Sequence, residues 1–93
     1  MIQSFADRDT RALFKEGMCH RRWRAFAKAA FRKLDMLDAA VELKDLRSPP
    51  GNRLEALSGS RAGQYSIRIN DQWRICFRWG ANGPEDVEIV DYH

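Results

Sequence analysis

The sequence predicts an α+β fold in which N-terminal helices pack on one face of a mostly antiparallel sheet. Before residue 48, apolar residues recur at the three- and four-residue spacing of an amphipathic helix. After a break at residues 48–52 the period changes to two, which is typical of strands. Short loops join the later strands, and this indicates an antiparallel meander. Helices followed by strands define the α+β class, and 93 residues suffice for a single domain, 1–93.

The first elements are expected to be short. Residues 2–5 predict a strand. Asp7 or Asp9 can cap the start of a helix that ends at Gly17, because short polar side chains suit an N-cap and glycine suits the residue that ends a helix.

A longer helix follows, with basic residues along one side. Its apolar stripe consists of Trp23, Phe26, Ala27, Ala30, Phe31, Leu34 and Leu37. On another side Arg24, Lys28 and Arg32 lie four residues apart, and like charges at that spacing cost on the order of a few tenths of a kcal/mol per pair. A bound polyanion would relieve this repulsion, and a solvated helix face is the alternative interpretation. A short helical turn is expected at residues 42–46.

The second half predicts a hairpin whose register can be deduced. Its strands lie within residues 65–79, between further strands at residues 53–57 and 86–91. The apolar residues of both hairpin strands must share one face. A three-residue loop at 70–72 meets that requirement, and it places Arg68 directly opposite Arg74.

The pair formed by Arg68 and Arg74 is a candidate phosphate site. Like charges directly opposite one another destabilise a sheet, and no acid on these two strands lies between them. Guanidinium groups bind phosphate oxygens through several donors at once. The alternative is surface ion pairing, of Arg68 with Glu55 and of Arg74 with Glu88 or Asp91.

Charge and composition limit the possible functions. The net charge is +3, and the segment from His20 to Leu34 carries six basic side chains and no acid, which suits a phosphate backbone. No apolar run approaches the roughly 20 residues that span a bilayer, and the start does not resemble a signal peptide, so we expect a cytoplasmic protein. Cys19 and Cys76 lack the spacing of a zinc site, and we expect neither a metal nor a cofactor.

The chain ends in Asp91, Tyr92 and His93. A histidine can act as an acid or a base near neutral pH, although a terminal histidine is ordinarily a frayed residue. Together with residues 65–79, 2–5 and 49–54, this ending resembles the HigB toxins of the RelE/ParE superfamily of toxin–antitoxin systems. The resemblance extends over nearly the whole chain.

The resemblance implies a RelE-like fold and an endoribonuclease that cleaves mRNA in the ribosomal A site. Because no Asp, Glu and His cluster has the spacing of metal ligands, we expect this cleavage to be metal-independent. It also implies a partner, a helix-turn-helix antitoxin of the HigA type. Two other functions compete: poisoning of DNA gyrase, as in the related ParE group, and plain binding of RNA or the ribosome without catalysis.

The family roles apply to matching positions. Arg68 and Arg74 would hold the scissile phosphate, and Tyr92 and His93 would position RNA and transfer protons. The general base is either Glu55 or His93, since Glu55 stands where some relatives carry a histidine. Arg61 would add a phosphate contact, although its loop lacks the Lys-Gly-Asp-like stretch of many relatives. Arg24, Lys28 and Arg32 would contact ribosomal RNA.

Overall fold

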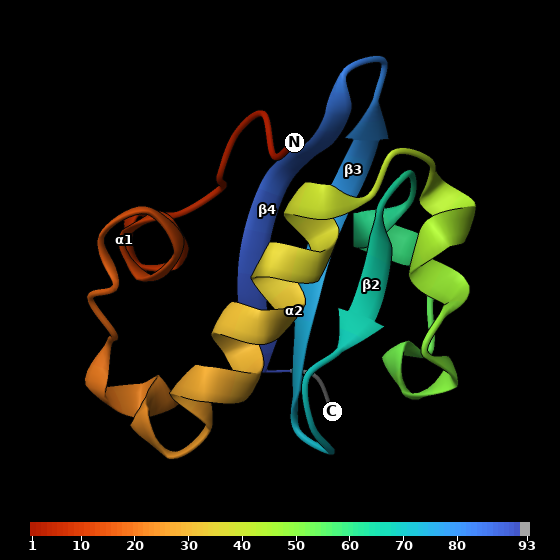
Figure 1. Ribbon diagram of the computed structural model, residues 1–93. Coiled ribbons are helices and arrows are strands. Elements are labelled where there is room, and N and C mark those ends of the chain that lie inside the picture. Colours follow the sequence, from red (N-terminus) through yellow and green to blue (C-terminus); the bar gives the residue numbers. More distant parts are fainter. Residues whose placement is uncertain (92–93) are drawn as a thin grey trace.

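The computed structural model describes residues 1–91, in which two helices cover one face of a four-stranded antiparallel sheet (Figure 1). The helices are α1 (Arg8–Glu16) and α2 (Ala27–Ala39), and the strands, in sheet order, are β1 (Glu55–Ala56), β2 (Tyr65–Arg68), β3 (Trp73–Gly80) and β4 (Gly83–Asp91). Short 3₁₀ helices join these elements: η1 (Arg21–Phe26), η2 (Leu43–Arg47), η3 (Pro50–Asn52) and η4 (Gly59–Arg61). The core lies between the two layers. The predicted α+β class and antiparallel meander are confirmed.

Helix α1 begins and ends where the sequence predicts. The Asp7 side chain accepts a hydrogen bond from the Thr10 backbone at 3.1 Å, so Asp7 rather than Asp9 is the N-cap. Gly17 ends the helix in the left-handed conformation, with φ of 68°, and its N–H bonds back to the last turn.

The longer helix is shorter than predicted. The segment that contains Trp23 and Arg24 forms η1, and α2 begins only after Phe26, whose φ and ψ of −130° and 23° interrupt the helix. Lys28 and Arg32 therefore share an α-helical face that Arg24 does not continue, although all three line one hollow in the surface. Phe31 was predicted to be in the core and is 42% exposed, which corrects the expected stripe.

Two predicted strands are reduced in the structure. Residues 2–5 make a single parallel bridge, Phe5 to Val87, flanked by hydrogen bonds to β4, rather than a strand. The strand predicted at residues 53–57 shrinks to β1, because Arg53 adopts a left-handed conformation with φ of 46° and turns the chain. The helical turn expected at residues 42–46 is present as η2.

The hairpin register is confirmed for every pair in β2 and β3, including Arg68 opposite Arg74 and Ile67 opposite Ile75. The Asn70 side chain stabilises the connecting loop by accepting hydrogen bonds from the backbones of Gln72 and Trp73. The sheet therefore turns Ile67 and Ile75 toward the helices and the arginines toward the opposite face. No helix within residues 1–91 is long and apolar enough to cross a membrane.

Candidate functional site

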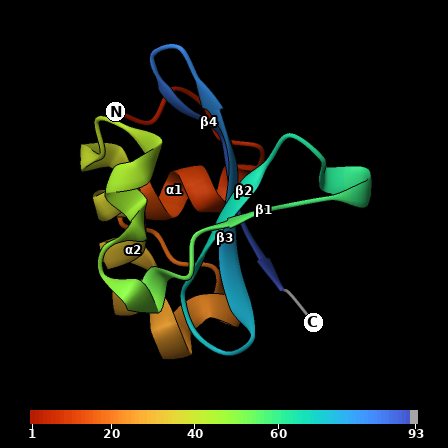
Figure 2. The same cartoon turned by 90° about the vertical axis from the view of Figure 1, so that its right-hand side faces the viewer.

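The face of the sheet that points away from the helices carries a row of polar side chains across all four strands. Directly opposed pairs join Glu55 of β1 to Ser66 of β2, Ser66 to Cys76 of β3, and Cys76 to Glu88 of β4. Directly opposed residues of an antiparallel sheet point to the same face, so these four side chains form one row. We call the surface around this row the outer face (Figure 2).

Arg74 lies in the next pair along the same face, and hydrogen bonds to two neighbouring residues help to hold it. Its Nε donates to Ser66 Oγ at 2.8 Å, and its Nη2 donates to the Arg53 carbonyl at 2.7 Å. Both acceptors are neutral, so these bonds orient the guanidinium without cancelling its charge. Ser66 is fully buried, which gives the first contact a rigid support.

Arg68 lies opposite Arg74, as predicted, and forms an ion pair with Asp71 of the hairpin loop. The carboxylate suggested from sequence for Arg68 was Glu55, so the partner differs. The Asp71 side chain is 99% exposed, and an ion pair of this kind is easily screened by solvent and salt.

The segment before β1 positions the Arg53 carbonyl, which accepts a hydrogen bond from Arg74. Asn52 is fully buried, and its side-chain amide donates to the carbonyl of Leu46 at 3.1 Å. Its carbonyl oxygen accepts from Lys33 of α2. With Asn52 anchored to α2 and η2, the left-handed turn at Arg53 presents its carbonyl to Arg74. Partial burial, with the charges of Arg32 and Arg68, lowers the pKa of Lys33.

Arg61 lies at the other side of the row. Its Nη1 donates to Glu88 Oε1 at 2.7 Å and to Gln64 Oε1 at 3.0 Å. The hydrogen bond with Glu88 raises the pKa of Arg61. Glu88 was suggested from sequence as a partner of Arg74, and the structure pairs it with Arg61 instead.

Cys76 lies between the two arginine positions and is fully buried. Burial raises the pKa of its thiol, Arg61 and Arg74 oppose that effect, and Glu88 and Glu55 add to it. The register and the hydrogen bonds place these four charged groups around Cys76 on the outer face. Among residues 1–91 there is no group of three side chains arranged to hold a metal ion.

The C-terminal end of β4 lies at the end of the sheet that carries Arg68 and Arg74. Asp91 pairs with Trp73 in the register and accepts a hydrogen bond from Gln72 at 3.0 Å. This end of the sheet also carries Arg68 and Arg74, since Val90 lies opposite Arg74. The predicted site residues Tyr92 and His93 lie outside the described part of the chain.

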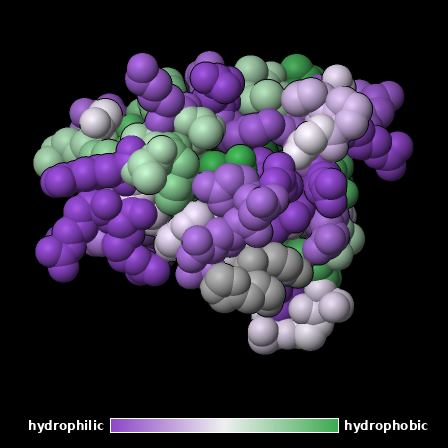
Figure 3. Space-filling model, turned by 90° about the horizontal axis from the view of Figure 1, so that it is seen from below, coloured by the Kyte–Doolittle hydropathy of each residue, from purple (hydrophilic) through white to green (hydrophobic). Residues whose placement is uncertain are grey.

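The predicted basic residues Arg24, Lys28 and Arg32 belong to the helical layer, so the structure does not bring them together with Arg74. They are all exposed. Seen from the end that carries the β2–β3 loop, the surface is largely hydrophilic, with apolar patches between the polar side chains (Figure 3). The chain thus presents two charged surfaces, the outer face and the basic helical layer.

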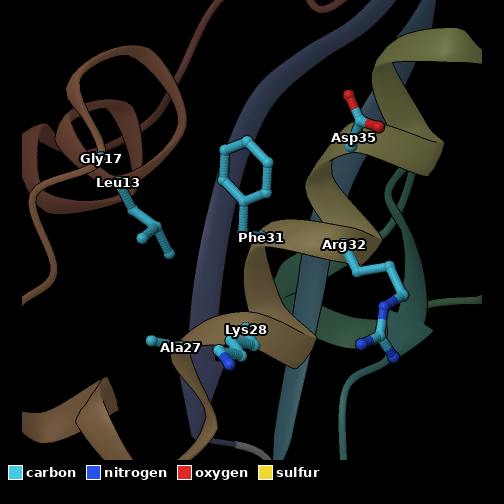
Figure 4. Close-up of a pocket in the computed structure, with 7 residues that line it drawn as sticks. All are labelled: Leu13, Gly17, Ala27, Lys28, Phe31, Arg32 and Asp35. Carbon is cyan, nitrogen blue, oxygen red and sulfur yellow. The ribbon is translucent and has the colours of Figure 1, made fainter.

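A groove of about 520 Å³ separates α1 from α2. Leu13 and Phe31 project into it, and Lys28, Arg32 and Asp35 also line it (Figure 4). It lies in the helical layer, away from the outer face.

The helix-on-sheet architecture is also found in a solved structure. The chain superposes on a chain of the YoeB–YefM complex from Staphylococcus aureus with a TM-score of 0.58 and 18% sequence identity, covering 100% of this chain and 98% of that one. A likeness at this identity establishes the fold.

Sequence comparison identifies the family. Residues 3–93 match the family model described as the RelE-like toxin of type II toxin–antitoxin system HigB. Toxin HigB-1 of Vibrio cholerae is 42% identical over 80 residues, which cover 85% of this chain and 84% of that protein. Endoribonuclease HigB of Proteus vulgaris is 28% identical over 93 residues and the full length of both chains. This chain belongs to the HigB-like toxin family, whose members are toxins of type II toxin–antitoxin systems.

Sequence reasoning missed the groups that hold the arginines. Ser66 and the Arg53 carbonyl orient Arg74, and Glu88 with Gln64 orients Arg61. The predicted register already placed Ser66 on the face of Arg74, so its contact was within reach of the sequence. The Arg53 contact depends on a turn whose direction the pattern of Pro49 and Pro50 does not reveal.

Proposed function

We propose that this toxin is a ribosome-dependent endoribonuclease that cleaves mRNA in the A site without a metal ion. The observation that carries the proposal is the position of Arg74. It lies directly opposite Arg68, and Ser66 and the Arg53 carbonyl orient its side chain. Two arginines from directly opposed positions on one face of the sheet supply positive charge for an anion site. The family membership and the name of the Proteus vulgaris relative support the same reaction.

The reaction follows from the charges on the outer face. The 2′-hydroxyl of one nucleotide attacks the adjacent phosphorus in line, so that an O2′–P bond forms and the P–O5′ bond breaks. The products are a 2′,3′-cyclic phosphate and a 5′-hydroxyl. Arg68 and Arg74 stabilise the charge that develops on the phosphoryl oxygens. A phosphate displaces Asp71 from Arg68 readily, because Asp71 is exposed and its pairing is screened.

Proton transfer needs a base for the 2′-hydroxyl and an acid for the departing O5′. Glu55 serves as the base in this proposal, because its partner in the register, Ser66, bonds to Arg74. Tyr92 and His93 position the RNA, and His93 returns the proton to the leaving oxygen. His93 as the base is the alternative. The ribosome aligns the RNA, and alignment alone can lower a barrier by several kcal/mol.

The other surfaces are assigned to partners. Arg24, Lys28 and Arg32 contact ribosomal RNA through their exposed positive charges. Arg61 contacts a phosphate of the RNA. The antitoxin partner is a helix-turn-helix protein of the HigA type. The toxin acts in the cytoplasm, where ribosomes translate.

The test is induced expression of the chain followed by mapping of transcript 5′ ends. Wild type and Arg74→Ala are compared, with Arg47→Ala as the matched control, since Arg47 is an exposed arginine on η2. We expect new 5′ ends inside translated codons with wild type and Arg47→Ala, and none with Arg74→Ala.

Growth arrest by wild type without new 5′ ends would remove the nuclease proposal. Accompanying DNA damage would then favour an action on gyrase, as in the ParE group. Arrest that depends on Arg24, Lys28 and Arg32 but not on Arg74 would favour a plain ribosome-binding module.

A further inference from the structure

Arg61 lies in a loop that has no buried side chain to hold it in place. Residues 58–63 contain η4 and no buried residue, and this connection between β1 and β2 extends away from the helical layer (Figure 2). A loop without buried side chains is held in place by its polar contacts. The ion pair from Arg61 to Glu88 joins this loop to β4.

The hydrogen bonds of Arg61 leave one edge of its guanidinium open. Both bonds, to Glu88 and to Gln64, use Nη1. A guanidinium has five N–H donors in a planar fork. Within residues 1–91, Nε and Nη2 of Arg61 have no protein acceptor, so they remain available to a ligand while Nη1 is fixed. The Arg61 side chain is 34% exposed, so part of it is accessible to solvent.

Arg61 and Arg74 approach the centre of the outer face from different strands. Arg74 extends from β3 to Ser66 on β2, and Arg61 reaches Glu88 on β4. Both charges act on the buried Cys76 thiol between them. Strands β2 and β4 are separated by two strand spacings, about 10 Å. One phosphate ester is therefore too small to contact both Arg74 at β2 and Arg61 at β4. An RNA backbone that crosses the strands can place one phosphate at each arginine.

We propose that Arg61 binds the RNA phosphate next to the scissile one, and that Glu88 and Gln64 are positioning residues that hold Arg61 for this contact. This inference rests on the proposed nuclease function. The RNA backbone then crosses the outer face from Arg74 to Arg61. A contact to a neighbouring phosphate is equally strong before and during the chemical step, so it affects KM rather than kcat.

The experiment measures kcat and KM on purified ribosomes programmed with an mRNA whose cleavage site has been mapped. Arg61→Ala should raise KM about tenfold with kcat within about twofold, since it removes a charge-assisted hydrogen bond to the RNA backbone. Glu88→Gln keeps the size of the side chain and should raise KM about threefold, because the weaker amide contact loosens the loop. In an Arg61→Ala background, Glu88→Gln should have no further effect.

Asp86→Asn is the matched control. Asp86 also lies on β4 and pairs with an arginine, Arg78, at 3.6 Å, although this pair is more exposed than that of Arg61 and Glu88. Asparagine tolerates the φ of 51° that Asp86 adopts, and KM should stay unchanged. Urea unfolding of each variant shows whether a change in KM reflects loss of the fold.

Three results would overturn the inference. Glu88→Gln could lower KM, which would mean that Glu88 competes with RNA for Arg61. Glu88→Gln could raise KM by the same factor in the Arg61→Ala background, which would mean that Glu88 acts independently of Arg61. Arg61→Ala could leave KM unchanged, as Asp86→Asn should, which would mean that Arg61 does not contact the RNA. If Arg74→Ala abolishes cleavage in the same assay, such a result removes only this inference. Cleavage by Arg74→Ala at the rate of wild type would remove the nuclease mechanism itself.

Discussion

Arg74 Nε donates to Ser66 Oγ at 2.8 Å, across the pair of strands whose register also sets Arg68 opposite Arg74. Ser66 has no exposed surface, so the atom that orients the proposed catalytic arginine is part of the packed sheet. The outer face therefore combines a rigid base with charged groups that remain partly open to solvent.

Removing the Ser66 hydroxyl should weaken catalysis more than folding. In Ser66→Ala, Arg74 loses the hydroxyl acceptor of its Nε, and we expect kcat to fall about tenfold with KM little changed. The measurement is the cleavage rate on programmed ribosomes. Cys76→Ala is the control, because Cys76 is also buried in the polar row. Equal losses of kcat in the two variants would show that Ser66 acts only through packing.

The identity of the general base can be decided by two substitutions. If Glu55 takes the proton of the 2′-hydroxyl, Glu55→Gln should lower kcat at least about a hundredfold, the usual contribution of a positioned base. Single-turnover cleavage measures this directly. His93→Gln is compared in parallel. Full activity of Glu55→Gln, with a loss in His93→Gln, would transfer the role of base to His93.

The left-handed end of α1 gives a prediction about stability. Gly17 has φ of 68° and nothing near the position of an added Cβ, so Gly17→Ala brings backbone strain without a clash. We expect the free energy of unfolding to drop by about 1 kcal/mol in urea titrations. Gly51→Ala is the matched control, because Gly51 also has open space but no positive φ. Its stability should be unchanged, and equal losses in both variants would rule out backbone strain as the cause.

The two cysteines should differ in reactivity. Cys19 is half-buried, whereas Cys76 has no exposed surface and burial raises the pKa of its thiol. At about pH 8, iodoacetamide should therefore alkylate Cys19 in the native protein and reach Cys76 only in urea, because the thiolate is the reactive form. Mass spectrometry of peptides gives the extent at each site. Native Cys76 that reacts as fast as Cys19 would show that the outer face opens readily.

The raised pKa of the Cys76 thiol makes the free energy of unfolding depend on pH. The folded chain keeps the Cys76 thiol protonated at pH values where the unfolded chain releases that proton. Cys76 therefore contributes stability below the ordinary thiol pKa, and this contribution decreases as the pH rises through it. The decrease should be smaller in Cys76→Ala, and an identical decrease in that variant would assign it to other groups.

The sequence by itself determined the features that depend on local periodicity and on neighbouring residues. The alternation of apolar and polar residues can be satisfied in one hairpin register only, so Arg68 opposite Arg74 followed from the pattern. The end of α1 followed from Gly17, and its start was limited to Asp7 or Asp9, because caps act within one turn of the helix.

The tertiary structure decided the features that depend on where distant segments meet. The buried Asn52 and the left-handed Arg53 place a carbonyl beside Arg74, and this requires both layers to be assembled. Glu88 pairs with Arg61 rather than Arg74, because the path of the loop before β2 brings Arg61 to β4. Side-chain partners of this kind are chosen by distances across the sheet, and sequence spacing carries no information about those distances.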